Sequence, residues 1–284
     1  MLDCAAMPEP TATPVTEAVP DPCAVAGIGV FDSGLGGLSV LRALRSRLPE
    51  APLHYVADSA HAPYGDRSEA YIVERSHRVA EHLVSNGARL LVVACNTATA
   101  AAVAGLRARW PGMPIVGVEP GLKPAAAATR NGRIAVLATR STLGSAKFQA
   151  LLAQQGDGVT VLAQPCPGLV DLIERGPLDA PDLRALVAHY AEPLRGAQVD
   201  TVVLGCTHYP FVRPLIEAAL GPQVQIIDTS DAVARRAAQL WAESRIVARH
   251  SPMVRLQTTG DADSLGRFAS AWLDVACEVS AVTI

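Results

Sequence analysis

The chain has 284 residues, a hydrophobic content of 50% and a formal net charge of −3 at neutral pH. This length and composition predict a folded globular protein with either one large domain or two of ordinary size. The charges are scattered, without a basic run or basic residues interleaved with aromatics. The pattern therefore argues against nucleic acid or an anionic membrane as the main partner and favours small-molecule chemistry.

The first 24 residues are rich in Pro, Ala and Thr, without the basic and apolar regions of a secretory signal. We expect a flexible N-terminal extension there. The run from Leu90 to Leu106 is shorter than the roughly 20 apolar residues of a membrane span, and Asn96, Thr97 and Thr99 interrupt it. It predicts a strand, a turn and an Ala-rich helix.

The six cysteines are widely spaced and include no CxxC pair, which indicates neither a disulfide framework nor a metal site. They are Cys4, Cys23, Cys95, Cys166, Cys206 and Cys277. A reducing cytoplasm fits this usage. We interpret Cys166 and Cys277 as small buried hydrophobes and place Cys4 and Cys23 in the extension.

Short β-branched runs alternate along the chain with Ala-, Leu- and Arg-rich stretches of helical period, which predicts an α/β fold with parallel sheets covered by helices. In the first half the runs are Ile28–Gly34, Leu53–Ser59, "LLVVACN" ending at Asn96, and Pro114–Pro120. In the second half they are Arg133–Ser141, Val159–Pro165, Thr201–Thr207 and Val224–Ser230.

The two sets of runs keep a nearly constant spacing. Matching Val30 with Val136 gives 136 − 30 = 106, and matching Cys95 with Cys206 gives 206 − 95 = 111. Evenly spaced strands occur in any α/β chain, but they do not predict a cysteine after the third run of both halves. We interpret the pattern as a duplication, with two similar Rossmann-like α/β/α lobes related by pseudo-twofold symmetry and the active site between them.

Ligands of open α/β sheets bind beyond the carboxyl ends of the strands, where both cysteines are expected. Cys95 and Cys206 would then approach one ligand from opposite sides. Cys95 precedes a predicted helix, and a helix N-terminus favours a thiolate through its amide donors and dipole. A disulfide is one use of two opposed thiols, but acid and base catalysis is more frequent in an intracellular α/β enzyme.

Two opposed thiols suit a racemisation, in which a thiolate removes a proton from one face of a carbon and a thiol returns one to the other. Each sulfur then needs a neighbour that controls its proton. Asp32 is placed to serve Cys95, whereas His208 and Glu174 lie on the side of Cys206. Groups to hold the ammonium and carboxylate of an amino acid are Ser33, Asn96, Thr97 and Thr207.

Five segments together resemble the glutamate racemases of the cofactor-independent aspartate/glutamate racemase superfamily. They are "GVFDSGLGGLSV" (29–40), "ADSAHAPYGDRS" (57–68), "ACNTATA" (94–100), "CPGLVDLIERG" (166–176) and "GCTHYP" (205–210). With their spacing, the segments cover the chain from about Gly27 to its end.

The resemblance implies that Cys95 and Cys206 are the catalytic acid/bases, one for each enantiomer, and that Asp32, Glu174 and His208 tune proton transfer. It places the substrate against Asp32, Ser33, Tyr64, Gly65, Asn96, Thr97, Thr207 and His208. The implied reaction interconverts L-glutamate and D-glutamate for peptidoglycan synthesis, without pyridoxal phosphate or a metal.

By the same resemblance, the last strand and helix, within Val254–Asp274, return to the first lobe. The expected domains are the extension (1–24), a first lobe (25–120 and 229–284) and a second lobe (121–228). Some family members with a comparable extension need a UDP-linked peptidoglycan precursor as activator, which is a hypothesis here because such a tail is equally compatible with disorder. A monomer and a homodimer both remain open.

Parts of the sequence are compatible with two other function classes. The loop "GLGGLS" with Asp58 farther along comes close to a dinucleotide fingerprint, typical of a dehydrogenase. We prefer a loop whose glycines bring backbone amides to a small carboxylate. A two-lobed amino-acid binding protein without turnover is the other alternative. Neither class needs twin cysteines. Within the racemases, glutamate rather than aspartate rests on the resemblance alone.

Overall fold

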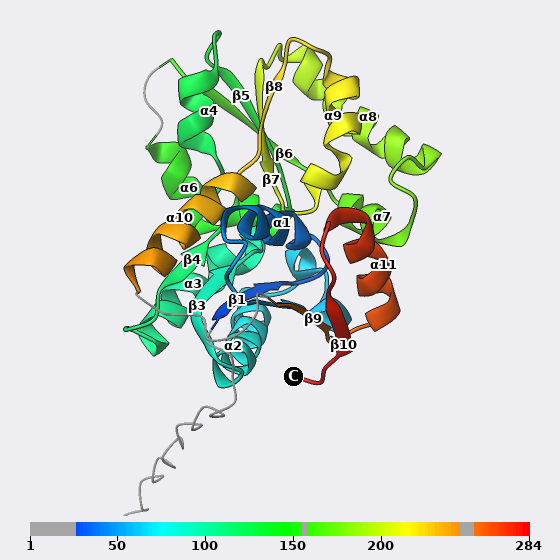
Figure 1. Cartoon of the computed structure of the whole chain (residues 1–284). Helices are drawn as coiled ribbons and strands as arrows, with labels where there is room; N and C mark the ends of the chain where they lie inside the picture. The colour runs from blue at the N-terminus through cyan, green and yellow to red at the C-terminus, as the bar shows by residue number, and fades with distance from the viewer. Residues whose placement is uncertain (1–26, 155–157, 245–252) are drawn as a thin grey trace, which may run out of the picture.

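In the computed structural model, residues 27–154, 158–244 and 253–284 are described. The predicted N-terminal extension lies outside them. The described chain forms two lobes, each built on its own parallel sheet (Figure 1). The α/β class with two parallel sheets is therefore confirmed. The domain boundaries at residues 120/121 and 228/229 stay a prediction.

The first lobe holds a six-stranded sheet. Its strands are β1 (Gly27–Asp32), β2 (Leu53–Ala57), β3 (Ala88–Val93), β4 (Ile115–Gly117), β9 (Val254–Thr258) and β10 (Glu278–Ala281). Its helices are α1 (Leu38–Arg47), α2 (Glu69–Ser85), α3 (Asn96–Arg109), α10 (Ser230–Glu243) and α11 (Ala262–Trp272), with the short 3₁₀ turns η1 (Ser59–His61) and η2 (Tyr64–Asp66).

The second lobe holds a four-stranded sheet. Its strands are β5 (Arg133–Ala138), β6 (Thr160–Pro165), β7 (Thr201–Gly205) and β8 (Gln225–Ile227). Its helices are α4 (Leu122–Ala128), α5 (Arg140–Gly144), α6 (Ala146–Ala153), α7 (Leu169–Arg175), α8 (Pro181–Gly196) and α9 (Arg213–Leu220), with the 3₁₀ turn η3 (Tyr209–Val212).

The two halves repeat one strand order. The first sheet runs β10-β9-β2-β1-β3-β4 and the second β6-β5-β7-β8, so the order β2-β1-β3-β4 recurs four strands later in the chain. This repeat agrees with the interpretation of a duplication. The returning strand β9 pairs in parallel with β2, beginning at Val254 opposite Leu53, and extends the first sheet at that edge. The C-terminal segment thus joins the first lobe, as expected.

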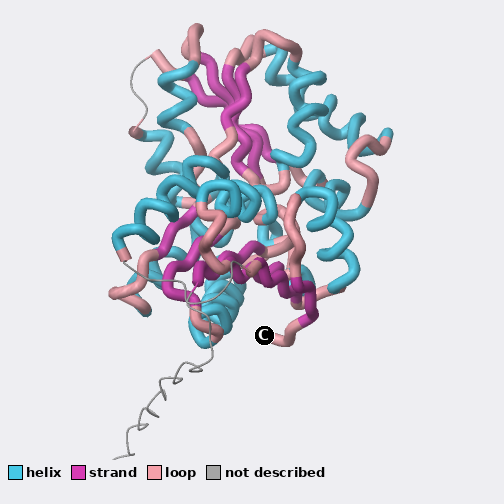
Figure 2. The backbone as a smooth tube through the Cα atoms, in the orientation of Figure 1, coloured by secondary structure: helices cyan, strands magenta, loops and turns pink. Residues whose placement is uncertain are grey.

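The strands carry apolar residues on both faces because helices cover both (Figure 2). In β3, Leu90 and Val92 pack with α1 and α10, whereas Leu91 and Val93 pack with α2 and α3. The second sheet alternates in the same way, with α7, α8 and α9 against one face and α4, α5 and α6 against the other. Burial on both faces explains the continuous apolar runs of the sequence.

Two chain positions at the strand ends differ slightly from expectation. The third strand ends at Val93, so Cys95 stands beyond it as the N-cap of α3. Cys206 directly follows β7.

In the described part of the chain, no helix is long and apolar enough to cross a membrane.

Two imidazoles share one acceptor beside the β2–β9 pair of the first sheet. His54 on β2 and His82 on α2 both place Nε2 2.8 Å from Oε1 of Gln257 on β9. Burial is the main cause that lowers the pKa of His54 from 6.5 to about 4; the hydrogen bond to Gln257 opposes it, and the nearby His82 and Arg255 add to it. A charged His54 is therefore disfavoured in the folded chain.

We expect this histidine to make the protein acid-sensitive. Between pH 6.5 and about 4 His54 binds a proton in the unfolded chain but not in the native state. The contribution of His54 to the free energy of unfolding is therefore complete above pH 6.5 and decreases as the pH falls toward 4. The loss is at most about 3 kcal/mol. Urea unfolding of His54→Gln should show a flatter pH dependence, whereas His189→Gln on exposed α8 should keep the wild-type slope. Equal slopes in all three proteins would contradict the assignment.

Candidate active site

A small cavity between the lobes gathers the predicted site residues. Its lining comes from the carboxyl ends of both sheets and comprises Asp32, Ser33, Pro63, Tyr64, Gly65, Cys95, Asn96, Thr97, Thr139, Val170, Gly205, Cys206, Thr207 and His208. Of the predicted residues, only Glu174 is not in the lining, and it binds His208 directly. The cavity measures about 20 Å³, room for about one water molecule. The lobes are therefore closed around the site.

Cys95 is held at the N-terminus of α3. Its Sγ accepts the backbone N–H of Ala98 at 3.4 Å and lies 3.7 Å from Ser33 Oγ. Despite that amide donor, burial and, to a lesser extent, the negative charge of Asp32 together raise the pKa of the thiol to about 12. The amide at the helix N-terminus favours the thiolate, as expected, but desolvation and a like charge outweigh it.

Cys206 has a charged neighbourhood instead. Its Sγ lies 3.7 Å from Nδ1 of His208, whose Nε2 lies 2.6 Å from Glu174 Oε1. The same carboxylate oxygen accepts the backbone N–H of Leu35 at 2.8 Å. A chain of contacts thus runs from Cys206 through the imidazole to a carboxylate that is anchored in the other lobe.

The proton of this chain resides on the histidine. Burial lowers the pKa of His208, but its hydrogen bonds to Cys206 and Glu174 and their charges raise it well above 6.5 overall. Burial raises the pKa of Glu174, but the hydrogen bond and charge of His208, together with the Leu35 amide, leave it below 4.5. An imidazolium between a carboxylate and a sulfur is therefore the favoured state, in which Nε2 donates to Glu174.

Asp32 is fully buried and receives donors from both lobes. Its Oδ1 accepts Ser33 Oγ at 3.0 Å and the Gly34 N–H at 3.1 Å, and its Oδ2 accepts Thr207 Oγ1 at 2.7 Å. Burial raises the pKa of Asp32, and the positive His208 and these hydrogen bonds only partly offset it. Asp32 reaches Cys95 through the Ser33 hydroxyl, as a neighbour that controls its proton would.

The glycine loop "GLGGLS" has a different use from the expected one. Its amides at Gly34 and Leu35 donate to Asp32 and Glu174, and the Gly36 amide lies 3.1 Å from His208 Nε2. A Cβ on Gly36 would collide with His208 and Thr207. The expectation that these amides serve a small carboxylate is wrong. Glycine lets the second lobe approach, and carboxylates of the protein accept the amides of Gly34 and Leu35.

Threonines close the opposite side of the site. Thr97 Oγ1 lies 3.1 Å from Thr139 Oγ1 and 3.3 Å from Thr142 Oγ1, across the lobes. Sequence reasoning missed Thr139 and Thr142. The repeat held a signal for the first, because 139 − 33 = 106 is the offset that matches β1 with β5, so Thr139 follows β5 as Ser33 follows β1.

Asn96 has a buried side-chain amide without a hydrogen-bond partner among the residues that the structure describes, at either Nδ2 or Oδ1. It lines the cavity and is 5% exposed. Buried polar groups are normally satisfied, so an orphaned donor and acceptor side by side indicate a polar ligand. An amino acid, with an ammonium and a carboxylate, offers both partners.

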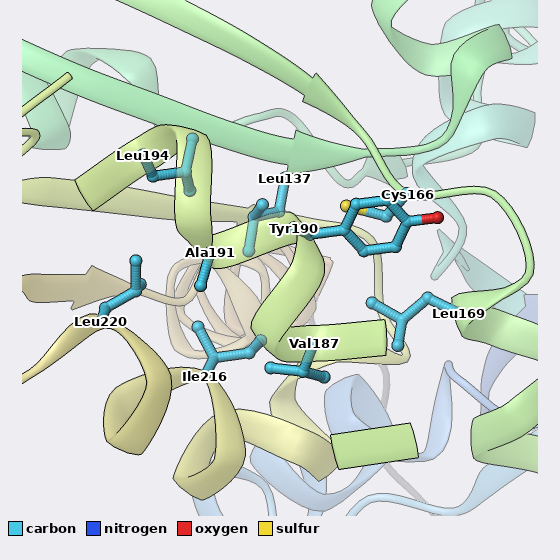
Figure 3. Close-up of a pocket in the computed structure, with 9 residues that line it drawn as sticks. All are labelled: Leu137, Cys166, Leu169, Val187, Tyr190, Ala191, Leu194, Ile216 and Leu220. Carbon is cyan, nitrogen blue, oxygen red and sulfur yellow. The ribbon is translucent and has the colours of Figure 1, made fainter. Parts of the chain in front are cut away.

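The other described cysteines lie elsewhere. Cys166 lines a small apolar cavity behind the second sheet, with Leu137 and Tyr190 beside it (Figure 3). Cys277 is half-buried near the first sheet. Both thiols are free. Within residues 27–154, 158–244 and 253–284, no three His, Cys, Asp or Glu side chains are grouped to hold a metal ion.

Known proteins match this chain over most of its length. The family model for Asp/Glu/Hydantoin racemase matches residues 38–237. A glutamate racemase of Ectopseudomonas mendocina (strain ymp) is 54% identical over 237 residues, which cover 83% of this chain and 90% of that protein. The crystal structure of a glutamate racemase isoform from Bacillus anthracis has a TM-score of 0.82 at 32% identity, with coverage of 91% and 98%.

A second solved structure is informative for its contents. It is the Escherichia coli glutamate racemase in complex with L-glutamate and the activator UDP-MurNAc-ala. It has a TM-score of 0.81 and 30% identity, and the match covers 91% of this chain and all of that chain (100%).

The pKa of Cys95 can be tested by alkylation with iodoacetamide, because only the thiolate reacts. With a pKa of about 12, the reaction rate at Cys95 should rise about tenfold per pH unit up to pH 10, whereas a thiol of ordinary pKa 9.0 levels off. Mass spectrometry of the labelled peptides gives the reaction rate at Cys95 and the rate at a thiol of ordinary pKa. Asp32→Asn should accelerate labelling of Cys95 by removing a like charge. A rate at Cys95 that levels off near pH 9 in the folded enzyme would refute the assignment.

Proposed function

The chain belongs to the Asp/Glu/hydantoin racemase family, and we propose that it is a glutamate racemase that interconverts L- and D-glutamate by a two-thiol mechanism. The observation that supports the mechanism most is that Cys95 and Cys206 line one cavity from different lobes. A substrate carbon between the two sulfurs can lose a proton to one face and gain a proton on the other.

The surroundings of the two sulfurs assign their starting roles. We assign Cys206 as the sulfur that accepts the α-proton, because it lies beside the imidazole of His208, whose pKa is raised well above 6.5. Cys95, with a raised pKa, begins as the thiol and gives its proton to the opposite face of the carbanion. One turnover leaves Cys206 as thiol and Cys95 as thiolate. Conversion of the other enantiomer starts from that state.

The remaining polar groups bind the amino acid. The free amide of Asn96 offers a donor and an acceptor, and the hydroxyls of Ser33, Thr97 and Thr207 border the same cavity. When the lobes part to admit glutamate, these hydroxyls exchange their contacts with each other for contacts with the substrate. The choice of glutamate over aspartate is supported by the glutamate racemases that match the chain.

The same proposal covers the cellular role. D-glutamate made by this reaction would supply peptidoglycan synthesis, and a cytoplasmic location would keep both thiols reduced.

A dehydrogenase is disfavoured by Asp58, the residue spaced for a ribose contact, because Arg75 and two hydroxyls occupy both of its carboxylate oxygens. A binding protein without turnover is separated from a racemase by assay.

The first test is the optical rotation of purified protein with L-glutamate or D-glutamate, each of which should decay to zero. The second follows α-deuterium uptake in D₂O. Cys95→Ser and Cys206→Ser should each lose racemisation by at least about a thousandfold, yet each should exchange the α-proton of one enantiomer, a different one in each variant. Exchange of the same enantiomer by both variants would refute the opposed-thiol geometry.

The variants are also constrained by equilibrium. Because the two enantiomers are equal in free energy, any substitution must lower kcat/KM equally in both directions, and only kcat and KM separately can differ. The exchange experiment is therefore sharper than a comparison of catalytic efficiencies. Cys166→Ser is the matched control, since that thiol lies in the separate apolar cavity and should leave racemisation within about threefold.

We also propose that a UDP-linked peptidoglycan precursor activates the enzyme, as the activator in the Escherichia coli structure suggests. The candidate place is an open groove of about 570 Å³ beside β4, α4 and α10, within the size range of ligand sites. Arg107, Lys123 and Arg236 line it and supply positive charge suited to a diphosphate. The predicted extension is a second candidate, and its deletion would test it.

The groove can be tested without touching the site. Lys123→Ala combined with Arg236→Ala should raise the activator concentration for half-maximal rate at least about tenfold, because two phosphate contacts are lost. Arg235→Ala, on the same helix but outside the groove, should leave that concentration unchanged. An unchanged response in the double variant, or a wild-type rate indifferent to the precursor, would contradict activation through this groove.

A further inference from the structure

We infer that Asp58, Arg75 and Thr259 are positioning residues that hold the Tyr64–Gly65 wall of the active site, an inference that rests on the proposed function. None of the three lines the cavity. They act through Tyr64, which lines the cavity while its hydroxyl is bound to Asp58.

The carboxylate of Asp58 is fully buried and completely engaged. Its Oδ2 accepts the Tyr64 hydroxyl at 2.6 Å and Arg75 Nε at 3.0 Å. Its Oδ1 accepts Arg75 Nη2 at 2.8 Å and Thr259 Oγ1 at 2.9 Å. Four donors on two oxygens, including a bidentate guanidinium, fix the carboxylate in one orientation. The carboxylate in turn fixes the tyrosine hydroxyl.

This arrangement decides what Tyr64 offers to a substrate. With its hydroxyl donated to Asp58, the residue presents its ring and the backbone at Gly65, and not a hydroxyl ligand. The backbone there has little freedom, because a Cβ on Gly65 would lie only 3.1 Å from the side chain of Thr139 in the second lobe. A small shift of the Tyr64 ring would therefore move a wall of the cavity.

The cluster also ties distant parts of the chain to the site. Arg75 on α2 donates from Nη1 to the carbonyl oxygen of Ile284 at 2.8 Å, and Thr259 follows the returning strand β9. The backbone N–H of Asp58 donates to the carbonyl of Asp32 at 2.9 Å. Asp58 thus contacts the backbone of Asp32 through its amide and the hydroxyl of Tyr64 through its carboxylate.

A buried ion pair is a poor source of stability, because removing two charges from water costs about as much as their attraction returns. It does specify geometry, since a bidentate pair tolerates little rotation. The position of this pair, one side chain away from the cavity, makes geometry its function here. Among these contacts, the Tyr64 hydroxyl is the group whose removal disturbs the rest of the structure least.

The test compares two tyrosine variants of the full-length enzyme. Tyr64→Phe keeps the ring but releases it from Asp58, and we expect KM for glutamate to rise about tenfold with kcat within about threefold. The pH profile should not move, because the thiols and His208 are untouched. The control is Tyr71→Phe, which removes a hydroxyl 2.7 Å from His61 Nδ1 outside the cavity and should keep the wild-type KM.

A second pair of variants separates positioning from simple stability. Thr259→Val deletes another donor to Asp58 and should raise KM in the same direction, by about threefold. Arg75→Lys keeps the charge but not the bidentate contact and should give a larger rise than Thr259→Val. Urea unfolding midpoints of all variants show whether KM follows the network or only the loss of stability.

The outcomes are distinguishable. A wild-type enzyme that racemises glutamate, together with Tyr64→Phe and Thr259→Val variants of unchanged KM, would overturn the inference while the proposed function stands. A KM that rises equally in Tyr71→Phe would overturn it too. A wild-type protein that racemises no glutamate would instead remove the proposed function.

Discussion

The site depends on one constraint, which is that the carboxylate of Asp32 is buried away from water. Buried completely, it takes one hydroxyl from Ser33 in its own lobe and one from Thr207 in the other. A buried acceptor must be satisfied, so the two lobes meet in the one arrangement that supplies both donors. Ser33 then stands against Cys95, and Thr207 keeps the loop of Cys206 and His208 in place. The closed cavity follows from this single requirement.

The sequence was sufficient for the strands and for the two cysteines, because runs buried on both faces and a repeated residue at equivalent ends are local patterns. The sequence was insufficient where the pKa or the contacts of a residue depend on side chains from distant parts of the chain. The helix position of Cys95 favours a thiolate, yet burial and Asp32 reverse the outcome. The glycines of "GLGGLS" indicate a close approach, but not that Glu174 and His208 are what approaches. Asp58 looked like a ribose ligand until Arg75 and Tyr64 were placed beside it.

The two halves share a strand order and differ in chemistry at matching positions. With the offset of 111, Asn96 corresponds to Thr207 and Thr97 to His208. Thr97 makes a neutral contact with Thr139 in the opposite lobe. His208 instead binds Glu174 within its own lobe, and that carboxylate accepts the Leu35 amide of the first lobe. A symmetric scaffold therefore carries an asymmetric pair of thiols. The repeated strand order places the two sulfurs at equivalent strand ends, and the differing neighbours are what the proposed mechanism uses to give one sulfur the role of acid and the other the role of base.

The closed cavity has a consequence for successive turnovers. It has room for about one water molecule, so a proton taken by one sulfur does not mix with bulk solvent while the lobes are shut. Under the proposed mechanism the enzyme leaves each reaction with its sulfurs in the opposite protonation state. Until the lobes open and the sulfurs exchange protons with solvent, the enzyme retains the protonation state left by the enantiomer it last converted.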